Sequence, residues 1–427
     1  MPKSNTMSCS FLVAVFLSAV LAACATVKVP GKEPAREVAE VQPVAAASLT
    51  CAPCPVCAQC TPPVTPLPAA KPMQLARWAD LPGWGDDDVS AAWPAFIQSC
   101  RVLVGKAQGA LWRPACDEAK SIDGRVDGRD PAVLRRFFES RFEPYLLTNP
   151  DGSTSGMITG YYEPLLRGSR SRGKPYLQPV LGVPGDLLTI ELGDLLPELK
   201  NMRLRGRLQG NKVVPYFSRA EIVGREKNYA DRVLLWVDDA VELFFLQVQG
   251  SGRVRLPDGG MVRIGYADQN GHPYQSIGRV LVERGELKLE QASMQGIQAW
   301  ARANPTRLND LLDSNPSYVF FREVSARGSD SDGPQGALGV PLFAERSIAV
   351  DPRHIPLGAP VFLSTTQPNS ATPLRRLMLA QDTGGAIRGV VRADFFWGFG
   401  AEAGAQAGRM KQSGQMWVLL PPGVAPK

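Results

Sequence analysis

The stretch that decides the fold is Leu377–Gly398, which reads LMLAQDTGGAIRGVVRADFFWG. An apolar run typical of a buried strand leads into Asp382 and a turn of two glycines. A second β-rich run ends at Asp394, which is followed by the aromatic residues Phe395–Trp397. Two carboxylates therefore lie beside glycines that let a ligand approach the backbone, and beside rings that can stack on a flat ligand.

A third acid follows the same pattern further up the chain. Asp351 comes directly after the apolar run Ser347–Val350, so it also lies at the end of a predicted strand. We expect these three strand-end acids to gather into a site. Each also has a structural interpretation, because an aspartate before glycine or proline commonly caps a turn, and for Asp382 and Asp351 this alternative remains open.

The first residues predict export and lipid anchoring. Met1–Ala23 has a lysine followed by the apolar run Phe11–Leu21, which is too short to span a bilayer and is typical of a signal peptide. It ends in Leu21-Ala22-Ala23-Cys24, which resembles a bacterial lipoprotein box and implies that Cys24 becomes the lipidated first residue. By the same resemblance, Ala25 implies sorting to the outer membrane, facing the periplasm. The alternative is an ordinary cleaved signal peptide.

Residues 24–73 are rich in proline and alanine and show no apolar periodicity, so they predict an extended tether. The tether contains four cysteines, each separated by two residues: Cys51, Cys54, Cys57 and Cys60. In an oxidising compartment we favour disulfides, within or between chains, over a metal or iron–sulfur site. Their pairing stays open.

The remaining cysteines and the histidines limit the chemistry. With Cys9 in the signal peptide and Cys24 lipidated, six of the eight cysteines are left, and Cys100 is predicted to pair with Cys116, closing a loop worth about 3 kcal/mol. Only two histidines occur in 427 residues, which argues against a Ser-His-Asp or Cys-His enzyme and against a histidine-rich zinc site. No metal and no cofactor is called for. The net charge of +6 suits an anionic polymer and is too small to indicate nucleic acid.

From about residue 74 the composition becomes globular, with helices first and strands afterwards. Asp88–Leu103 has helical spacing with a break or late start at Pro94, and Asp130-Pro131 is a helix cap followed by an apolar face. Further along we predict strands at Met157–Glu163, Val241–Val248 and Tyr318–Phe321, a hairpin over Val254–Ile264, and helices at Leu289–Ala303 and Pro305–Ser314.

Several motifs, in this order behind a lipoprotein box, carry a resemblance to a known family. They are GYYEP, QVQGSG, GYADQNGHPYQSIGRVL, NPSYVFF, SIAVDPRHIPLG and QDTGGAIRG followed by ADFFWG. Together they resemble the membrane-bound lytic murein transglycosylase A family over about residues 157–421. The C-terminal part, about residues 336–421, also resembles the three-aspartate (3D) domain of wall-associated proteins.

The resemblance implies a mainly β fold of the α+β class. A double-psi β-barrel catalytic domain would be formed by residues 74–164 and 318–427. A smaller β-barrel domain for substrate binding, residues 165–317, would be inserted, and a groove for a glycan strand would lie between the two domains.

The resemblance also implies the reaction. The enzyme would be a peptidoglycan exotransglycosylase that cleaves the β-1,4 bond between N-acetylmuramic acid and N-acetylglucosamine and leaves 1,6-anhydromuramic acid ends. By the family motif Asp394 is the single acid/base, supported by Asp382 and Asp351. Breaking a glycosidic bond requires a proton on the leaving oxygen, and the apolar neighbours of Asp394 suit a raised pKa that keeps it protonated. The residues alone do not decide between the ends and the interior of strands, or identify partner enzymes in the wall.

The residues predicted to bind the sugar lie in these motifs or, for Thr159, directly before GYYEP. They are Thr159, Tyr161, Tyr162, Glu163, Gln249, Ser251, Tyr266 and Trp397. Two other functions compete with catalysis on glycan. An aspartic protease needs two Asp-Thr-Gly-type turns, and only the one at Asp382 is present. A non-catalytic peptidoglycan-binding lipoprotein would use the same barrel without cleavage, and the presence of Asp394 argues against it.

Overall fold

The computed structural model describes residues 71–199, 202, 204–324 and 333–424. The signal peptide, Cys24 and the four tether cysteines lie outside these residues, so their predicted roles remain predictions. None of the helices in the described ranges is both long enough and apolar enough to cross a membrane.

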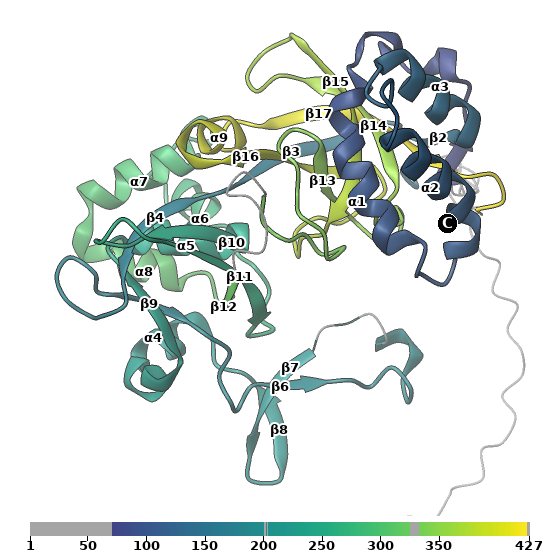
Figure 1. Cartoon of the computed structure of the whole chain (residues 1–427). Coiled ribbons are helices and arrows are strands. Elements are labelled where there is room, and N and C mark those ends of the chain that lie inside the picture. Colours follow the sequence, from purple (N-terminus) through teal and green to yellow (C-terminus); the bar gives the residue numbers. More distant parts are fainter. Residues whose placement is uncertain (1–70, 200–201, 203, 325–332, 425–427) are drawn as a thin grey trace, which may run out of the picture. The chain divides into compact units, whose positions relative to one another are not determined.

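Six strands close into a ring. Their order is β17-β14-β15-β13-β16-β3, and β3 pairs back onto β17. The strands are β3 (Gly156–Glu163), β13 (Ser347–Val350), β14 (Pro360–Thr366), β15 (Pro373–Asp382), β16 (Arg392–Phe399) and β17 (Lys411–Leu420). In Figure 1 the blue β3 runs beside the yellow β16 and β17, so segments more than 200 residues apart form one barrel. The fold is mainly β, in the α+β class; the double-psi connectivity stays a prediction.

Two further strands extend this sheet at β17. They are β1 (Met73–Leu75) and β2 (Glu143–Leu147), which pair with each other, and β2 pairs with β17. The strands form here because their apolar residues face one large core, which includes Phe362, Leu377 and Val418, each fully buried.

Three helices pack on this core and lie together in Figure 1: α1 (Trp93–Leu103), α2 (Gly109–Asp123) and α3 (Pro131–Arg141). α1 begins late, with Pro94 in its first turn, as predicted. α3 begins where predicted, because the Asp130 carboxylate accepts a hydrogen bond from the Ala132 amide at 2.8 Å. A disulfide joins Cys100 on α1 to Cys116 on α2, the two cysteines that the sequence paired.

The residues between β3 and β13 build two more sheets. The larger has the order β12-β11-β10-β4-β9-β5, and the smaller has the order β6-β7-β8. Their strands are β4 (Leu165–Ser169), β5 (Gln178–Leu181), β6 (Leu188–Ile190), β7 (Leu204–Gln209), β8 (Lys212–Pro215), β9 (Val233–Val237), β10 (Ser251–Arg255), β11 (Met261–Gln269) and β12 (Val319–Val324). β10 and β11 form the predicted hairpin, with Val254 opposite Val262.

Six more α-helices and several 3-10 turns complete the described part of the chain. The helices are α4 (Arg219–Gly224), α5 (Ala240–Gln249), α6 (Ile277–Glu283), α7 (Met294–Ala303), α8 (Leu308–Asp313) and α9 (Gly400–Ala407). The 3-10 turns are η1 (Trp78–Asp80), η2 (Trp84–Asp86), η3 (Val89–Ala92), η4 (Pro197–Leu199), η5 (Glu226–Arg232), η6 (Leu289–Gln291) and η7 (Pro305–Arg307). The two helices predicted between residues 289 and 314 are present as α7 and α8, each preceded by a 3-10 turn.

One prediction was wrong: the apolar run Val241–Val248 is the helix α5 and not a strand. The Asp239 carboxylate accepts hydrogen bonds from the Val241 and Glu242 amides and starts the helix, and Gly250, at a φ of 81°, ends it. A short apolar run buried on all sides fits a strand and a helix equally well, so only the caps at its two ends distinguish them.

Candidate active site

Asp394 lies inside a strand, and not at the end of one as the sequence suggested. β16 begins at Arg392, and the preceding residues Ile387–Val391 form turns that include Gly389 at a φ of 118°. The apolar residues of that run are buried without strand pairing. Because Asp394 is part of β16, the alternation of side chains along the strand decides which residues share its face.

The two faces of β16 have different neighbours. Ala393, Phe395 and Trp397 point into the main core. The opposite face carries Arg392, Asp394 and Phe396, and Phe396 belongs to a separate small cluster with Tyr161, Leu342, Ala349 and Ile387. Asp394 therefore projects from the barrel on the side away from the main core, beside a small apolar cluster.

The Asp394 carboxyl group is half-buried and accepts one hydrogen bond from the described residues. Thr159 on β3 donates its hydroxyl to Oδ1 of Asp394 at 2.6 Å. The two residues are register partners on parallel strands, which explains the close approach. Burial raises the pKa of Asp394 to about 6; the hydrogen bond from Thr159 and the charge of Arg392 oppose this rise, and the charge of Asp382 adds to it.

Asp382, at the end of β15, is held by several donors. Its Oδ2 accepts the Tyr161 hydroxyl at 3.0 Å, and its Oδ1 accepts the Ala337 amide at 2.9 Å. Burial raises its pKa, while these bonds and one from the Thr383 amide act against the rise. Tyr161 has its own pKa raised, by burial and then by the charges of Asp382 and Asp394, so its ring lies close to both acids.

Asp351 follows β13, as predicted, but its carboxylate is fully buried. It accepts hydrogen bonds from the Arg353 guanidinium at 2.6 Å and from the Gly389 amide at 3.0 Å. These bonds outweigh the effect of burial and hold its pKa well below the usual range. Asp351 is therefore charged, and its oxygens accept hydrogen bonds that stabilise the turn before β16. This agrees with the interpretation of Asp351 as a residue that forms a turn.

The arrangement provides one carboxyl group suited to proton transfer near neutral pH, Asp394, next to a second acid, Asp382, whose oxygens are occupied. A pKa near the working pH is what an acid/base catalyst needs. Across the described ranges, no three histidine, cysteine or acidic side chains are gathered so that they could hold a metal ion.

Comparison with known proteins identifies the family of this chain. Residues 157–322 match the family model described as the MltA specific insert domain, and residues 346–420 match that of the 3D domain. The membrane-bound lytic murein transglycosylase A of Escherichia coli strain K12 is 33% identical over 301 residues, which is 68% of this chain and 72% of that protein. The chain belongs to the membrane-bound lytic murein transglycosylase A family.

Solved structures agree with the assignment. The crystal structure of MltA from Neisseria gonorrhoeae, in its monoclinic form, has a TM-score of 0.70 at 38% identity, covering 84% of this chain and 98% of that one. The structure of E. coli MltA with bound chitohexaose has a TM-score of 0.62 at 27% identity, covering 83% and 96%. The chain is therefore a lytic transglycosylase of peptidoglycan, a polysaccharide lyase with a 3D domain.

Within this transglycosylase, the predicted sugar-binding residues are divided among several places. Thr159 and Tyr161 contact the acids. Tyr162 points the opposite way, because neighbouring residues on a strand face opposite sides. It lines a separate cavity of about 190 Å³ together with Gln249, whose Oε1 accepts the Tyr162 amide at 3.0 Å, and with residues of α6 and α7.

The other predicted binding residues do not join the acids. Glu163 is buried in an ion pair with Arg253, at 2.9 Å. Trp397 lies in the main core, where its indole contacts the sulfur of Met410. Gly160 makes room for it, since a Cβ there would come within 2.7 Å of the indole nitrogen. Ser251 and Tyr266 lie on β10 and β11, both half-buried, in the larger of the two other sheets.

One residue beside Asp394 in the candidate site was missed from the sequence. Arg392 is 8% exposed and lies two residues before Asp394 on the same strand face. Its Nη2 donates to the Thr159 hydroxyl at 2.9 Å. Arg392 and Asp394 are two residues apart, a spacing that places both side chains on one face of a strand. This could be inferred only with the knowledge that β16 begins at Arg392.

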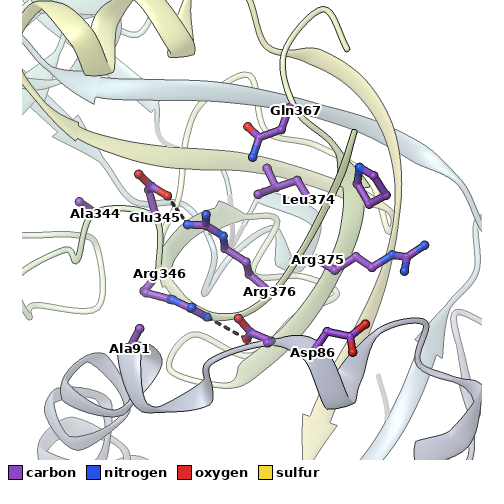
Figure 2. A pocket seen from close by; sticks show the side chains of 11 residues that line it. Asp86, Ala91, Ala344, Glu345, Arg346, Gln367, Leu374, Arg375 and Arg376 are labelled. Carbon is purple, nitrogen blue, oxygen red and sulfur yellow. Dashed lines mark hydrogen bonds and ion pairs between the residues drawn. The ribbon is translucent and has the colours of Figure 1, made fainter. Parts of the chain in front are cut away.

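A larger depression, of about 700 Å³, is not lined by any of the three acids. It lies between η2, η3, the segment 344–346 and the β14–β15 hairpin, and Figure 2 shows its side chains. Most of its charged groups are already paired, Arg376 with Glu345 and Arg346 with Asp87. Asp394 and its neighbours, and not this depression, therefore form the candidate active site.

Proposed function

We propose that Asp394 is the single acid/base of this transglycosylase and that the bond cleaved is the β-1,4 link from N-acetylmuramic acid to N-acetylglucosamine. The observation that carries the proposal is a carboxyl group with a pKa of about 6, which projects away from the main core and has one protein hydrogen bond among the described residues. Asp382 and Asp351 support it, the first through charge and the second through the turn before β16.

The reaction proceeds in two proton transfers. Protonated Asp394 gives its proton to the glycosidic oxygen, and the bond from that oxygen to C1 of the muramic acid breaks with an oxocarbenium-like transition state. The Asp394 carboxylate then takes the proton of the C6 hydroxyl, and the C6 oxygen bonds to C1. The product is a 1,6-anhydro ring, and no water is consumed. The attacking hydroxyl belongs to the same sugar, so proximity lowers the barrier.

A hydrolase would need a second carboxylate to activate water or attack C1. Asp382 is poorly suited to this, because both of its oxygens already accept hydrogen bonds from Tyr161 and Ala337. Asp351 is less suited still, since it is fully buried and paired with Arg353. These contacts support a mechanism with one acid.

The substrate is proposed to be a glycan strand of peptidoglycan. The related E. coli MltA was crystallised with bound chitohexaose, a chain of sugars, which supports an extended site here. We propose that the glycan strand lies in a groove between the barrel domain and the inserted domain. The sequence predicted residues 74–164 with 318–427 for the barrel and 165–317 for the insert, but β12 (Val319–Val324) pairs in the larger sheet of the inserted residues, so we extend the insert to residue 324. Thr159 and Tyr161 would be nearest the bond that is cleaved.

The experiment that tests the reaction is digestion of purified peptidoglycan in water enriched with heavy oxygen. We expect muropeptides that are one water lighter than hydrolysed ends and that carry no label. Labelled reducing ends as the main product would rule out the transglycosylase mechanism, whichever residue supplies the proton.

We further propose that the enzyme is an outer-membrane lipoprotein anchored through Cys24 and facing the periplasm. Replacing Cys24 by alanine should release a soluble periplasmic protein that still cleaves glycan, because only the anchor is lost. A Cys24→Ala protein that stays with washed membranes would contradict this.

A further inference from the structure

We propose that Arg392 is a positioning residue that acts through Thr159 to fix which oxygen of Asp394 carries the catalytic proton. The inference rests on the proposed function, because it takes Asp394 as the acid. It concerns three side chains on two adjacent parallel strands: Arg392 and Asp394 on β16, and Thr159 on β3.

The direction of the hydrogen bonds follows from the chemistry of the groups. A guanidinium has only donors, so the Thr159 oxygen must accept from Arg392 Nη2 over their 2.9 Å contact. The single hydrogen of the Thr159 hydroxyl is then free for the 2.6 Å contact with Oδ1 of Asp394. Arg392 therefore sets Thr159 as the donor and Oδ1 as the acceptor.

This direction decides where the acid proton lies. Oδ1 of a neutral Asp394 accepts the threonine hydrogen, so the carboxyl proton must be on Oδ2. Oδ2 has no hydrogen-bond partner among the described residues, and we infer that it is the oxygen that meets the substrate. Without the arginine, the Thr159 hydroxyl can rotate and accept a proton from Oδ1, which would hold that proton in an unproductive bond.

Arg392 itself is held in place for this task. It is nearly fully buried, and its Nη1 donates to the backbone carbonyls of Met157, at 3.3 Å, and of Ala393. None of the ion pairs found among the described residues contains Arg392, and Asp394 is the acid whose charge acts on it. A buried cation without a direct carboxylate partner is costly, so its retention beside Asp394 fits a role in the site.

The same contacts predict a pH signature. The charged groups that face Asp394 are Arg392 on its own strand and Asp382 on β15, with the Tyr161 hydroxyl on β3 near both acids. Arg392 and Thr159 both stabilise the Asp394 carboxylate. Removing either one should raise the pKa of Asp394, so activity should persist to higher pH, while the rate at low pH should fall because the proton is misplaced.

The experiment measures kcat/KM against pH for the full-length enzyme on purified peptidoglycan. We expect Arg392→Met and Thr159→Val to move the alkaline limb to higher pH and to lower the low-pH rate by roughly tenfold, the effect of one hydrogen bond. Arg392→Lys and Thr159→Ser, which keep the donor and the hydroxyl, should stay close to the wild type. Combining Arg392→Met with Thr159→Val should lower the low-pH rate no further than Thr159→Val alone.

A matched control is available in Arg219. Like Arg392 it is buried, at 6% exposed, and its guanidinium donates to backbone carbonyls, those of Asn315 and Ser317. Unlike Arg392 it lies on α4 and has no hydrogen bond to Thr159 or Asp394 among the described residues. Arg219→Met should lower the melting temperature without moving the limb. The inference would be overturned if the alkaline limb of the kcat/KM profile did not move in a folded Arg392→Met protein. It would also be overturned if the losses of low-pH rate in the double variant were fully additive.

Asp394→Asn in the same series separates a failure of the proposed function from a failure of the role of Arg392. If Asp394→Asn is active, the proposed function has failed. If Asp394→Asn is inactive but Arg392→Met behaves as the wild type, only the role of Arg392 has failed.

Discussion

Asp382 and Asp394 lie on opposite sides of β13 and at the same level, because both are register partners of Ala349. Two strand spacings separate their backbones by roughly 10 Å. Tyr161 lies near both acids and donates its hydroxyl to Asp382, so the two carboxylates interact through charge while only one of them is held by that hydroxyl. This difference in contacts supports the proposed roles, Asp394 as the catalytic acid and Asp382 as a supporting one.

The first prediction is that Asp394→Asn abolishes glycan cleavage while the protein stays folded. An amide has the shape of the acid but cannot give up and recover a proton, so the rate should fall by roughly 10²–10⁴. The measurement is release of soluble muropeptides, with circular dichroism as the check on folding. Turnover close to normal would transfer the role to Asp382 or Asp351.

The second prediction concerns stability, for which the sign can be worked out. The folded pKa of Asp394 is about 6, above the ordinary 3.8, so the native state holds the proton more tightly than the unfolded chain. The stabilisation that comes from this tighter proton binding is complete below pH 3.8 and is lost as the pH rises through 6. The total corresponds to at most about 3 kcal/mol. Asp394→Asn should therefore raise the melting temperature at pH 8 and change it little at pH 4. An equal change at both pH values would contradict the raised pKa.

The third prediction uses the charge of Asp382. Its carboxylate raises the pKa of Asp394, so Asp382→Asn should lower that pKa and move the alkaline limb of the kcat/KM profile to lower pH. In the wild type this limb should begin near pH 6 and fall about tenfold per pH unit. The shift is opposite in direction to the one expected for Arg392→Met. A limb that moves to higher pH would show that Asp382 acts on Asp394 by something other than charge.

The fourth prediction is that Glu163→Gln destabilises the protein by about 3 kcal/mol, because it removes the carboxylate from the buried ion pair with Arg253. Arg253 also lies over the Phe399 ring, at 4.1 Å, so it cannot move to water without losing that contact. Unfolding in urea measures the effect. Adding Arg253→Met should recover part of the loss. A sugar-binding role for Glu163 would instead raise KM and leave the free energy of unfolding unchanged.

The sequence predicted the elements whose signals are local. The α3 cap at Asp130, the late start of α1 at Pro94, the β10–β11 hairpin and the pairing of Cys100 with Cys116 depend on residues close together in the chain. Val241–Val248 was assigned wrongly because apolar character alone does not distinguish a buried helix from a strand. Asp394 was placed at a strand end because the turns before β16 are as apolar as a strand.

The sequence by itself determined the family and the mainly β class, since short motifs with fixed chemistry carry that information, and it made Asp394 the candidate acid. Only the tertiary structure decided what each polar side chain contacts. In the folded protein Thr159 and Tyr161 contact the acids, and Tyr162 lies on the other face of the same strand. Glu163 forms a buried ion pair, and Trp397 lies in the core. The physical reason is that parallel pairing of β3 with β16 joins segments more than 200 residues apart. The register of that pairing, which no local pattern encodes, sets Arg392, Thr159 and Asp394 within hydrogen-bond distance.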